Sequence, residues 1–454
     1  MKKMLNPLTA FSLVNEAWCD EQILLSNLVQ SIADDVVQQG SFANAIERAA
    51  RLPGFSRFFE YDPADPAASF RPHQQLLFPP DKPIDMLLIS PDVSRADAYA
   101  EQRCLLLTTS EMVRQATDTL AWIAGDQQKA VPLPPLLDSL DALGCLTEAE
   151  LPPFPSRFAR NGIHRLQHAS LLYVYNGASV LIDPVLHSIG FGRAATDPAL
   201  LEISRSCSAI LISHSHGDHF EPASLALFPR QTPIIVPKIN RTNILTSSIV
   251  APLHTMGFEN IIEVEWWQQA IKVGDITVTA LPFYGEQPRS QAPLRHTELR
   301  NIGNTYLIET PCDRSWLIVD TGDEFDQKMS SVALTLKEKY GSVDHVASNL
   351  GKFRIRIPTY VSGSGSYWVC LKNEDMASFA QLKSECLTLG PQGVAELIAA
   401  CNCRSFIPYA DWWGEMGQPS TNQADLTDEL KVELKRVGSA CSVENINIGD
   451  SLLF

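Results

Sequence analysis

Short apolar runs separated by turn-forming residues dominate the chain from about residue 160 onward. Runs rich in Val, Ile, Leu and Tyr, bounded by Gly, Pro, Asn or Asp, are typical of β-strands. We predict strands over residues 170–175, 179–182, 209–213, 233–236, 276–281, 304–309 and 316–319, and helices over 329–340 and 392–400. Strands that dominate early, with helices later, indicate a sheet sandwich with helices on its outer faces, an α/β (α+β) fold.

The first 155 residues have a different pattern, and we expect residues 1 to about 60 to be helical. Apolar positions recur there at helical spacing. We predict helices within residues 21–37, 42–52 and 135–149, the last closed by Gly144, and strands over 86–89 and 104–107. The run Pro152-Pro153-Phe154-Pro155 favours a boundary near residue 155. We therefore predict a smaller mixed N-terminal domain, residues 1–155, and a larger domain, residues 156–454.

The composition indicates a globular protein and narrows its partners. Hydrophobic residues make up 45% of the chain and charged residues 19%. The formal net charge of −16 disfavours nucleic acid as a partner, because such binders present a basic surface. Polar residues such as Asn6 and Glu16 interrupt any apolar leader, and no apolar run is long enough to cross a bilayer. We expect a cytoplasmic protein without membrane contact.

Three histidines and an aspartate follow the predicted strand 209–213 within six residues, as His214-Ser215-His216-Gly217-Asp218-His219. Seven of the ten histidines of the chain fall between His164 and His254. A loop at a strand end can turn such side chains inward, so that His214 and His216 bind one cation while Asp218 and His219 bind a second. We expect Gly217 to permit a tight turn. This pattern predicts a dinuclear metal site.

The run H-x-H-x-D-H resembles the signature of the metallo-β-lactamase superfamily. His168-Ala169-Ser170 and Val180-Leu181-Ile182-Asp183-Pro184-Val185 resemble the opening of its branch with lactonase-like and phospholipase-D-like members. The resemblance covers roughly residues 160 to 415. It implies an αββα sandwich with two metal ions at one edge of the paired sheets. It also implies that Asp183 orders a loop rather than binding metal.

The resemblance implies further ligands, two of which depart from the family pattern. A histidine is due after strand 276–281, where Glu286 is the natural substitute. Asp320, which ends the strand 316–319, fits a ligand that bridges the two ions, although it could also initiate the turn before Gly322. The closing histidine is due at Ala410 or Asp411, and only Asp411 can coordinate. His345, from a different loop, is the rival for that last position.

These ligands are compatible with three functions, of which one is favoured and two are alternatives. Two imidazoles with carboxylates suit iron or manganese better than an all-histidine set does. Glu286 at the third position resembles the diiron β-hydroxylase of the chloramphenicol pathway, which implies a non-haem diiron oxygenase that uses an external electron donor and a small or carrier-tethered substrate. The first alternative is a hydrolase of a lactone, amide or phosphodiester, with zinc as the alternative metal, in which Asp218 orients the attacking hydroxide or accepts its proton. The second is a scaffold with a lapsed site. The N-terminal domain could serve dimerisation or carrier docking.

Overall fold

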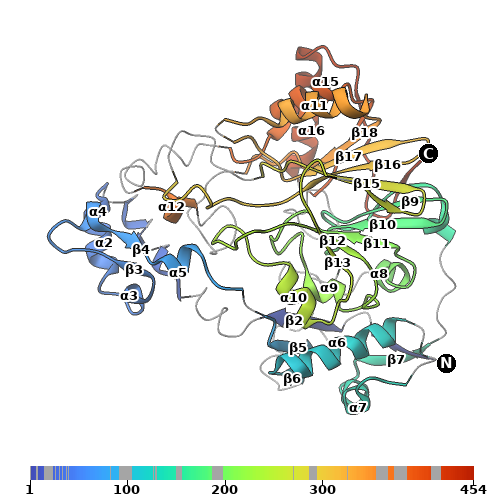
Figure 1. Cartoon of the computed structure of the whole chain (residues 1–454), viewed down its shortest axis with the longest axis horizontal. Helices are drawn as coiled ribbons and strands as arrows, with labels where there is room; N and C mark the ends of the chain where they lie inside the picture. The colour runs from blue at the N-terminus through green and yellow to red at the C-terminus, as the bar shows by residue number, and fades with distance from the viewer. Residues whose placement is uncertain are drawn as a thin grey trace.

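The computed structural model places two large sheets face to face in the second part of the chain (Figure 1). It describes residues 2–6, 9–14, 24–25, 27–29, 31–32, 34–36, 38, 40–81, 83–90, 105–125, 127, 130–149, 156–186, 198–268, 270–285, 294–324, 326–353, 367–372, 386–410 and 421–454. All structural statements concern these residues.

The first sheet has seven strands in the order β13-β12-β11-β10-β9-β8-β21. The strands are β8 (Gly162–Arg165), β9 (Leu171–Tyr175), β10 (Ala178–Ile182), β11 (Ala209–Leu211), β12 (Ile234–Pro237), β13 (Ile261–Val264) and β21 (Ser451–Leu453). Strands β10 to β13 are parallel, and the others are antiparallel. All of β11 is buried, because both faces of this central strand are covered.

The second sheet repeats this plan with the order β14-β15-β16-β17-β18-β19-β20. The strands are β14 (Ile271–Val273), β15 (Ile276–Leu281), β16 (Thr305–Glu309), β17 (Arg314–Val319), β18 (His345–Ser348), β19 (Ser405–Pro408) and β20 (Ser442–Val443). Strands β17 to β20 are parallel. Because β16 is antiparallel to both β15 and β17, these two strands end at the same edge of the sheet.

Three apolar layers hold the sandwich together. Side chains of both sheets, among them Val180, Leu211 and Ile308, form one buried cluster between them. The outer face of the second sheet is covered by α11 (Met329–Tyr340), α15 (Gly390–Cys401) and α16 (Thr421–Arg436). The buried positions of α11 have helical spacing, Met329, Val332, Ala333 and Leu336. On the first sheet lie α8 (Pro198–Ile203), α9 (Pro222–Leu225) and α10 (Val250–Thr255).

The N-terminal region packs on the sandwich at two places. The cluster that covers the first sheet also contains residues of α6 (Ser110–Ala124), α7 (Pro134–Ala142), β5 (Met86–Ser90) and β6 (Leu105–Leu107). A second cluster joins α2 (Phe42–Ala49), α3 (Phe55–Phe58), α5 (Gln74–Leu77) and the short strand β3 (Phe59–Glu60) to Leu245 and Leu299. Strand β3 pairs with β4 (Arg71–Pro72). Beside this cluster lies α4 (Pro66–Ser69), which contacts α2. The boundary near residue 155 stays a prediction.

The αββα sandwich and its seven predicted strands are confirmed, as are the helices at 329–340 and 392–400. The helix predicted from residue 135 is confirmed up to Ala142 as α7, and Gly144 follows it with φ 76°, in the left-handed region that ends helices. Residues 146–149 of the predicted range form a strand instead. The helical prediction for residues 1 to about 60 was wrong at its start, where β1 (Lys2–Leu5) pairs with β7 (Leu146–Ala149) and β2 (Ala10–Val14) pairs with β5. These strands form because distant partners supply their hydrogen bonds. No helix in the described part of the chain is long and apolar enough to span a membrane.

Candidate metal centre

The histidine motif lies where β11 ends, and it folds into a compact turn. The backbone amides of His219 and Phe220 donate to the carbonyl of His216, at 2.9 and 2.8 Å. The turn gathers the imidazoles, since the ring centre of His214 lies 4.5 Å from that of His216 and 4.2 Å from that of His219. The expected tight turn is present, but it does not require a glycine at position 217. The φ of Gly217 lies outside the left-handed region, and a Cβ there would meet nothing within 4 Å.

Asp320 joins this cluster from the second sheet, directly after β17. Its Oδ2 lies 2.9 Å from Nε2 of His219, and its side chain is buried. Donor atoms of His214, His219 and Asp320 all lie within 4.8 Å of one another. Asn349, which follows β18, donates from Nδ2 to the other oxygen of Asp320. Asp320 is thus held where the two sheets meet, as its prediction as a ligand requires.

A second group of donor atoms consists of His168, Asp218 and His219, again within 4.8 Å of one another. Oδ2 of Asp218 lies 3.8 Å from Nε2 of His219 and 3.4 Å from Nε2 of His168. The turn with His168 follows β8, which is antiparallel to β9 and therefore ends at the same edge as β10 and β11. Sequence reasoning had not proposed His168 as a ligand, although it too follows a strand.

Asp183 sets the orientation of two imidazoles without facing the cluster itself. It is fully buried after β10, and Oδ2 lies 2.9 Å from Nδ1 of His219 and 2.5 Å from the hydroxyl of Ser213. That hydroxyl lies 2.9 Å from Nδ1 of His214. Because a carboxylate only accepts, Nδ1–H of His219 and the Ser213 hydroxyl donate to it, and Nδ1–H of His214 donates to Ser213. Nε2 of His214 then carries the lone pair that a metal ligand needs. Nε2 of His219 donates to Asp320 here and would offer its lone pair once a cation replaces that proton.

Some buried polar atoms of the site have no hydrogen-bond partner among the described residues, as expected for a site that holds metal ions. Nε2 of His214 is buried and has no hydrogen-bond partner among the described residues. The same holds for the hydroxyl of Tyr409, which follows β19. Buried polar atoms rarely stay without a partner unless an ion or water satisfies them. Phe283 stacks on His214 with ring centres 5.0 Å apart and shields that side of the cluster.

The charges of His214 and Asp218 match the protonation states that ligands need, whereas His219 holds a proton. Burial lowers the pKa of His219, but Asp320 and Asp218 outweigh it and raise that pKa well above its usual value. Burial lowers the pKa of His214 well below its usual value, with the neighbouring His219 and His216 acting in the same direction. Burial raises the pKa of Asp218, but His219, His168 and His216 outweigh it and lower that pKa below its ordinary range. His214 is therefore a neutral imidazole and Asp218 a carboxylate, the forms that bind cations.

Two predicted ligands, Glu286 and Asp411, lie outside the described residues, but their neighbours lie at the site. Gly285 forms a β-bridge with Thr321, and the amide of Gly322 donates to the carbonyl of Tyr284 at 3.0 Å. The segment that leads to Glu286 therefore runs beside the segment that follows Asp320. The amide of Ala410 donates to the carbonyl of His168 at 3.2 Å.

His345, the rival for the last position, lies at the opposite end of the sheet. It opens β18 opposite Ser315, four residues before Asn349, which corresponds to about 13 Å along a strand. Its Nε2 lies 3.1 Å from Asp313, and its Nδ1 lies 2.6 Å from Ser405. His345 therefore has polar partners of its own and does not reach the cluster.

Comparison with protein families agrees with this geometry. Residues 178–353, which include the histidine motif and Asp320, match the model of the beta-lactamase superfamily domain. These residues form a β-lactamase superfamily domain. No curated protein matches the sequence.

Solved structures share the fold beyond the β-lactamase superfamily domain. A point mutant of the CmlA beta-hydroxylase matches with a TM-score of 0.56 and 14% identity, over 100% of both chains. CmlA, a diiron beta-hydroxylase from Streptomyces venezuelae, matches with a TM-score of 0.54 and 17% identity, over 97% of this chain and 85% of that one. A possible metal-dependent hydrolase from Veillonella parvula has a TM-score of 0.46 and 12% identity, over 65% and 100% of the two chains. At such identities the likeness shows the fold alone.

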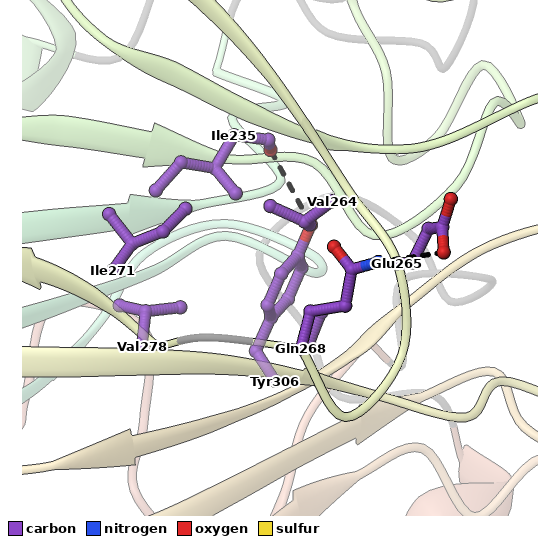
Figure 2. A pocket seen from close by; sticks show the side chains of 8 residues that line it. Ile235, Val264, Glu265, Gln268, Ile271, Val278 and Tyr306 are labelled. Atoms are coloured by element: carbon purple, nitrogen blue, oxygen red, sulfur yellow. Dashed lines mark hydrogen bonds between the residues drawn. The ribbon is translucent and has the colours of Figure 1, made fainter.

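Residues of the β-lactamase superfamily domain also line a small pocket between the two sheets (Figure 2). Its wall consists of Ile235, Val264, Glu265, Gln268, Ile271, Val278, Ala280 and Tyr306. The hydroxyl of Tyr306 donates to the carbonyl of Ile212 at 2.7 Å. No candidate ligand lines this pocket, so it is separate from the metal centre.

Proposed function

We propose that this protein is a dinuclear metalloenzyme, a non-haem diiron oxygenase that hydroxylates a small or carrier-tethered substrate. One ion is bound by His214, His216, Glu286 and Asp320. The other is bound by Asp218, His219 and Asp320, with Asp411 as the residue that the sequence offers for the remaining position. The observation that carries this proposal is the pair of donor groups that share His219, combined with a glutamate where a histidine is due.

The donor set favours iron over zinc. Two histidines and a carboxylate with open positions form the set associated with non-haem Fe(II) enzymes, and carboxylates also suit manganese. When bound, two iron ions would supply oxygen activation, with electrons from an external donor. The bridge between Gly285 and Thr321 supports Glu286 as a ligand, because it fixes the residue before Glu286 beside the residue after Asp320.

The residues of the chain contribute orientation and exclusion of water. Asp183 binds Nδ1 of His219 directly and Nδ1 of His214 through Ser213, which leaves the Nε2 atoms of both rings to face the ions. Asn349 occupies one oxygen of Asp320, so that the other faces His219. Phe283 covers His214 with an apolar ring. The side chain of Asp218 is 18% exposed, so a substrate would approach the ions from this side.

The exposure of Asp218 also favours a second candidate, a metal-dependent hydrolase. A partly exposed carboxylate beside the ions can orient an attacking water and accept its proton. The same ligands serve this reaction, with a lactone, amide or phosphodiester as substrate. The scaffold alternative requires that the site binds no metal.

Metal content and oxygen uptake separate these three functions. Protein purified without oxygen is expected to contain about two irons per chain and to consume oxygen when a reductant is added. Two zincs per chain with no oxygen uptake, and turnover of a generic lactone or phosphodiester, would establish the hydrolase. Protein that binds neither iron nor zinc after reconstitution would establish the scaffold.

Replacement of Glu286 by histidine tests the ligand that distinguishes iron from zinc. The Glu286→His variant is expected to shift the preference from iron toward zinc, because imidazole is a softer donor than carboxylate. The iron-to-zinc ratio after reconstitution with an equimolar mixture measures the shift. Glu298→His is the control, since Glu298 is an exposed residue paired with Arg241 at 2.8 Å. An unchanged ratio in Glu286→His would remove Glu286 from the ligands.

The remaining parts of the proposal concern partners. The substrate is a small molecule or a carrier-tethered one, and an electron donor must dock near the site. We propose residues 1–155 as the region for carrier docking or dimerisation, and a cytoplasmic location. Light scattering of the full chain, alone and with a carrier protein, measures both kinds of association.

A further inference from the structure

The last ligand position of the second ion lacks the histidine of the family pattern. That pattern places the closing histidine at Ala410 or Asp411, and the methyl group of Ala410 has no donor atom. Ala410 is buried directly after Tyr409 and has φ 59°, an uncommon conformation for alanine. Its amide donates to the carbonyl of His168 at 3.2 Å. The backbone of His168 is therefore fixed next to the position that lacks a ligand.

The side chain of His168 is turned toward the second ion's ligands. Its Nε2 lies 3.4 Å from Oδ2 of Asp218, and its ring centre lies 5.6 Å from that of His219. Two atoms bound to one ion by bonds of about 2.1 Å lie about 3.0 to 3.5 Å apart. The separation of His168 and Asp218 is thus that of two ligands of one ion, and it is long for a direct hydrogen bond to a carboxylate.

The backbone of His168 is held in a costly conformation that points the ring inward. Its φ of 49° is in the left-handed region, which costs on the order of 1 kcal/mol for a residue other than glycine. The turn is fixed on both sides, since Leu166 donates to the carbonyl of Ser170 and Ser170 donates to that of Gln167. The ring is 4% exposed. Such strain is concentrated at functional sites.

We propose that His168 is the last protein ligand of the second metal ion and replaces the histidine that is missing at position 410 or 411. Its Nε2 then joins Asp218, His219 and Asp320 around that ion. The proposal rests on the dinuclear site proposed above, but it does not depend on whether the metal is iron or zinc. The last ligand position of the second ion thus belongs to His168 rather than to Asp411.

Metal stoichiometry tests this assignment with Co(II) as the probe. The full-length protein, stripped and reconstituted with Co(II), is expected to bind two ions per chain, and the His168→Gln variant about one. Glutamine can still donate to Asp218 but is a poor ligand, so that a role in hydrogen bonding alone would leave two ions bound. The absorption of Co(II) in the visible range reports the loss of one coordination site. Two ions retained in His168→Gln would overturn the proposal.

Two further variants keep the test valid if His168→Gln loses stability. His164→Gln is the matched control, because His164 is equally buried and bonds to Ser451 and Arg160 instead. It is expected to keep two ions, as is Asp411→Ala. Adding Ala410→His to His168→Gln restores the family ligand and should restore the second ion. Failure of this rescue together with loss of an ion in Asp411→Ala would contradict the role of His168.

The result is distinguishable from the outcome for the proposed function. Zinc in the isolated protein and no oxygen uptake would reject the oxygenase, while the number of Co(II) ions in the variants would still decide the role of His168. Iron with oxygen uptake and two ions in His168→Gln would retain the oxygenase and reject the ligand.

Discussion

Asp183 is fully buried and accepts hydrogen bonds from the backbone and hydroxyl of Ser213 and from the ring of His219. Each of these bonds orders a part of the loop that carries the ligands. The sequence-based hypothesis that Asp183 orders a loop rather than binding metal is consistent with this geometry.

We predict that Asp183→Asn lowers metal affinity about 10- to 100-fold, as the loss of a partner behind a ligand commonly does. The amide would offer a donor where the Ser213 hydroxyl and His219 already donate, which favours the wrong tautomers. Competition with a chelator measures the affinity. Asp313→Asn is the control, because Asp313 pairs with His345 and Tyr173 at the far end of the strands. An unchanged affinity in Asp183→Asn would refute the tautomer argument.

At the scale of elements, the site is made by strand ends. Strands β8, β10, β11, β17, β18 and β19 are followed by His168, Asp183, His214, Asp320, Asn349 and Tyr409, respectively. Their shared direction brings these ends to one edge of the sandwich. The two sheets are joined there by a bridge between His214 and Gly303.

Gly303 allows this contact, and we predict that Gly303→Ala disrupts it. A Cβ at Gly303 would lie 2.7 Å from the carbonyl oxygen of Ser213 and 2.9 Å from Cβ of His214. Such overpacking costs about 1–3 kcal/mol and would displace His214. The urea midpoint and the metal content are both expected to fall. Gly217→Ala is the control within the motif, because a Cβ there has open space. Equal effects of the two substitutions would contradict this explanation.

At the scale of the whole molecule, the N-terminal region and the sandwich share a hydrophobic core. Leu120 of α6 and Leu227 beside the first sheet belong to the same buried cluster. Arg230 also joins the sandwich to the N-terminal region. Its Nη2 donates to the carbonyl of Thr117 in α6, and its Nε lies 3.1 Å from Asp118 of the same helix. Its guanidinium also lies 4.7 Å from the ring centre of Phe258. The two regions are expected to unfold together.

We predict that Arg230→Ala lowers the free energy of unfolding by about 2–3 kcal/mol, because it leaves buried acceptors without their donor. Tryptophan fluorescence and metal release, followed in the same urea titration, should shift together to a lower midpoint. Arg51→Ala is the control, since Arg51 is exposed after α2. Two separate transitions in the variant or in the parent protein would show that the regions unfold independently.

The sequence by itself determined the central strands and the histidine motif, because both depend on local patterns. The apolar run of β11 and the helical spacing of α11 are visible without any partner. The motif specifies its donor atoms by residue type, and its position after a strand indicates where they lie.

Only the tertiary structure decided which separate strand ends meet. Strand β8 pairs with β21 near the end of the chain, and β1 pairs with β7. Because these partners are distant in the sequence, the local sequence pattern did not predict β1 or β8 as strands. His345 and His168 both adjoin strands in the sequence, yet His345 opens its strand and His168 follows one. The direction of its strand therefore places His345 far from the metal centre, and that of β8 places His168 beside Asp218. Strand direction depends on which strands pair, and the composition of a strand does not reveal it.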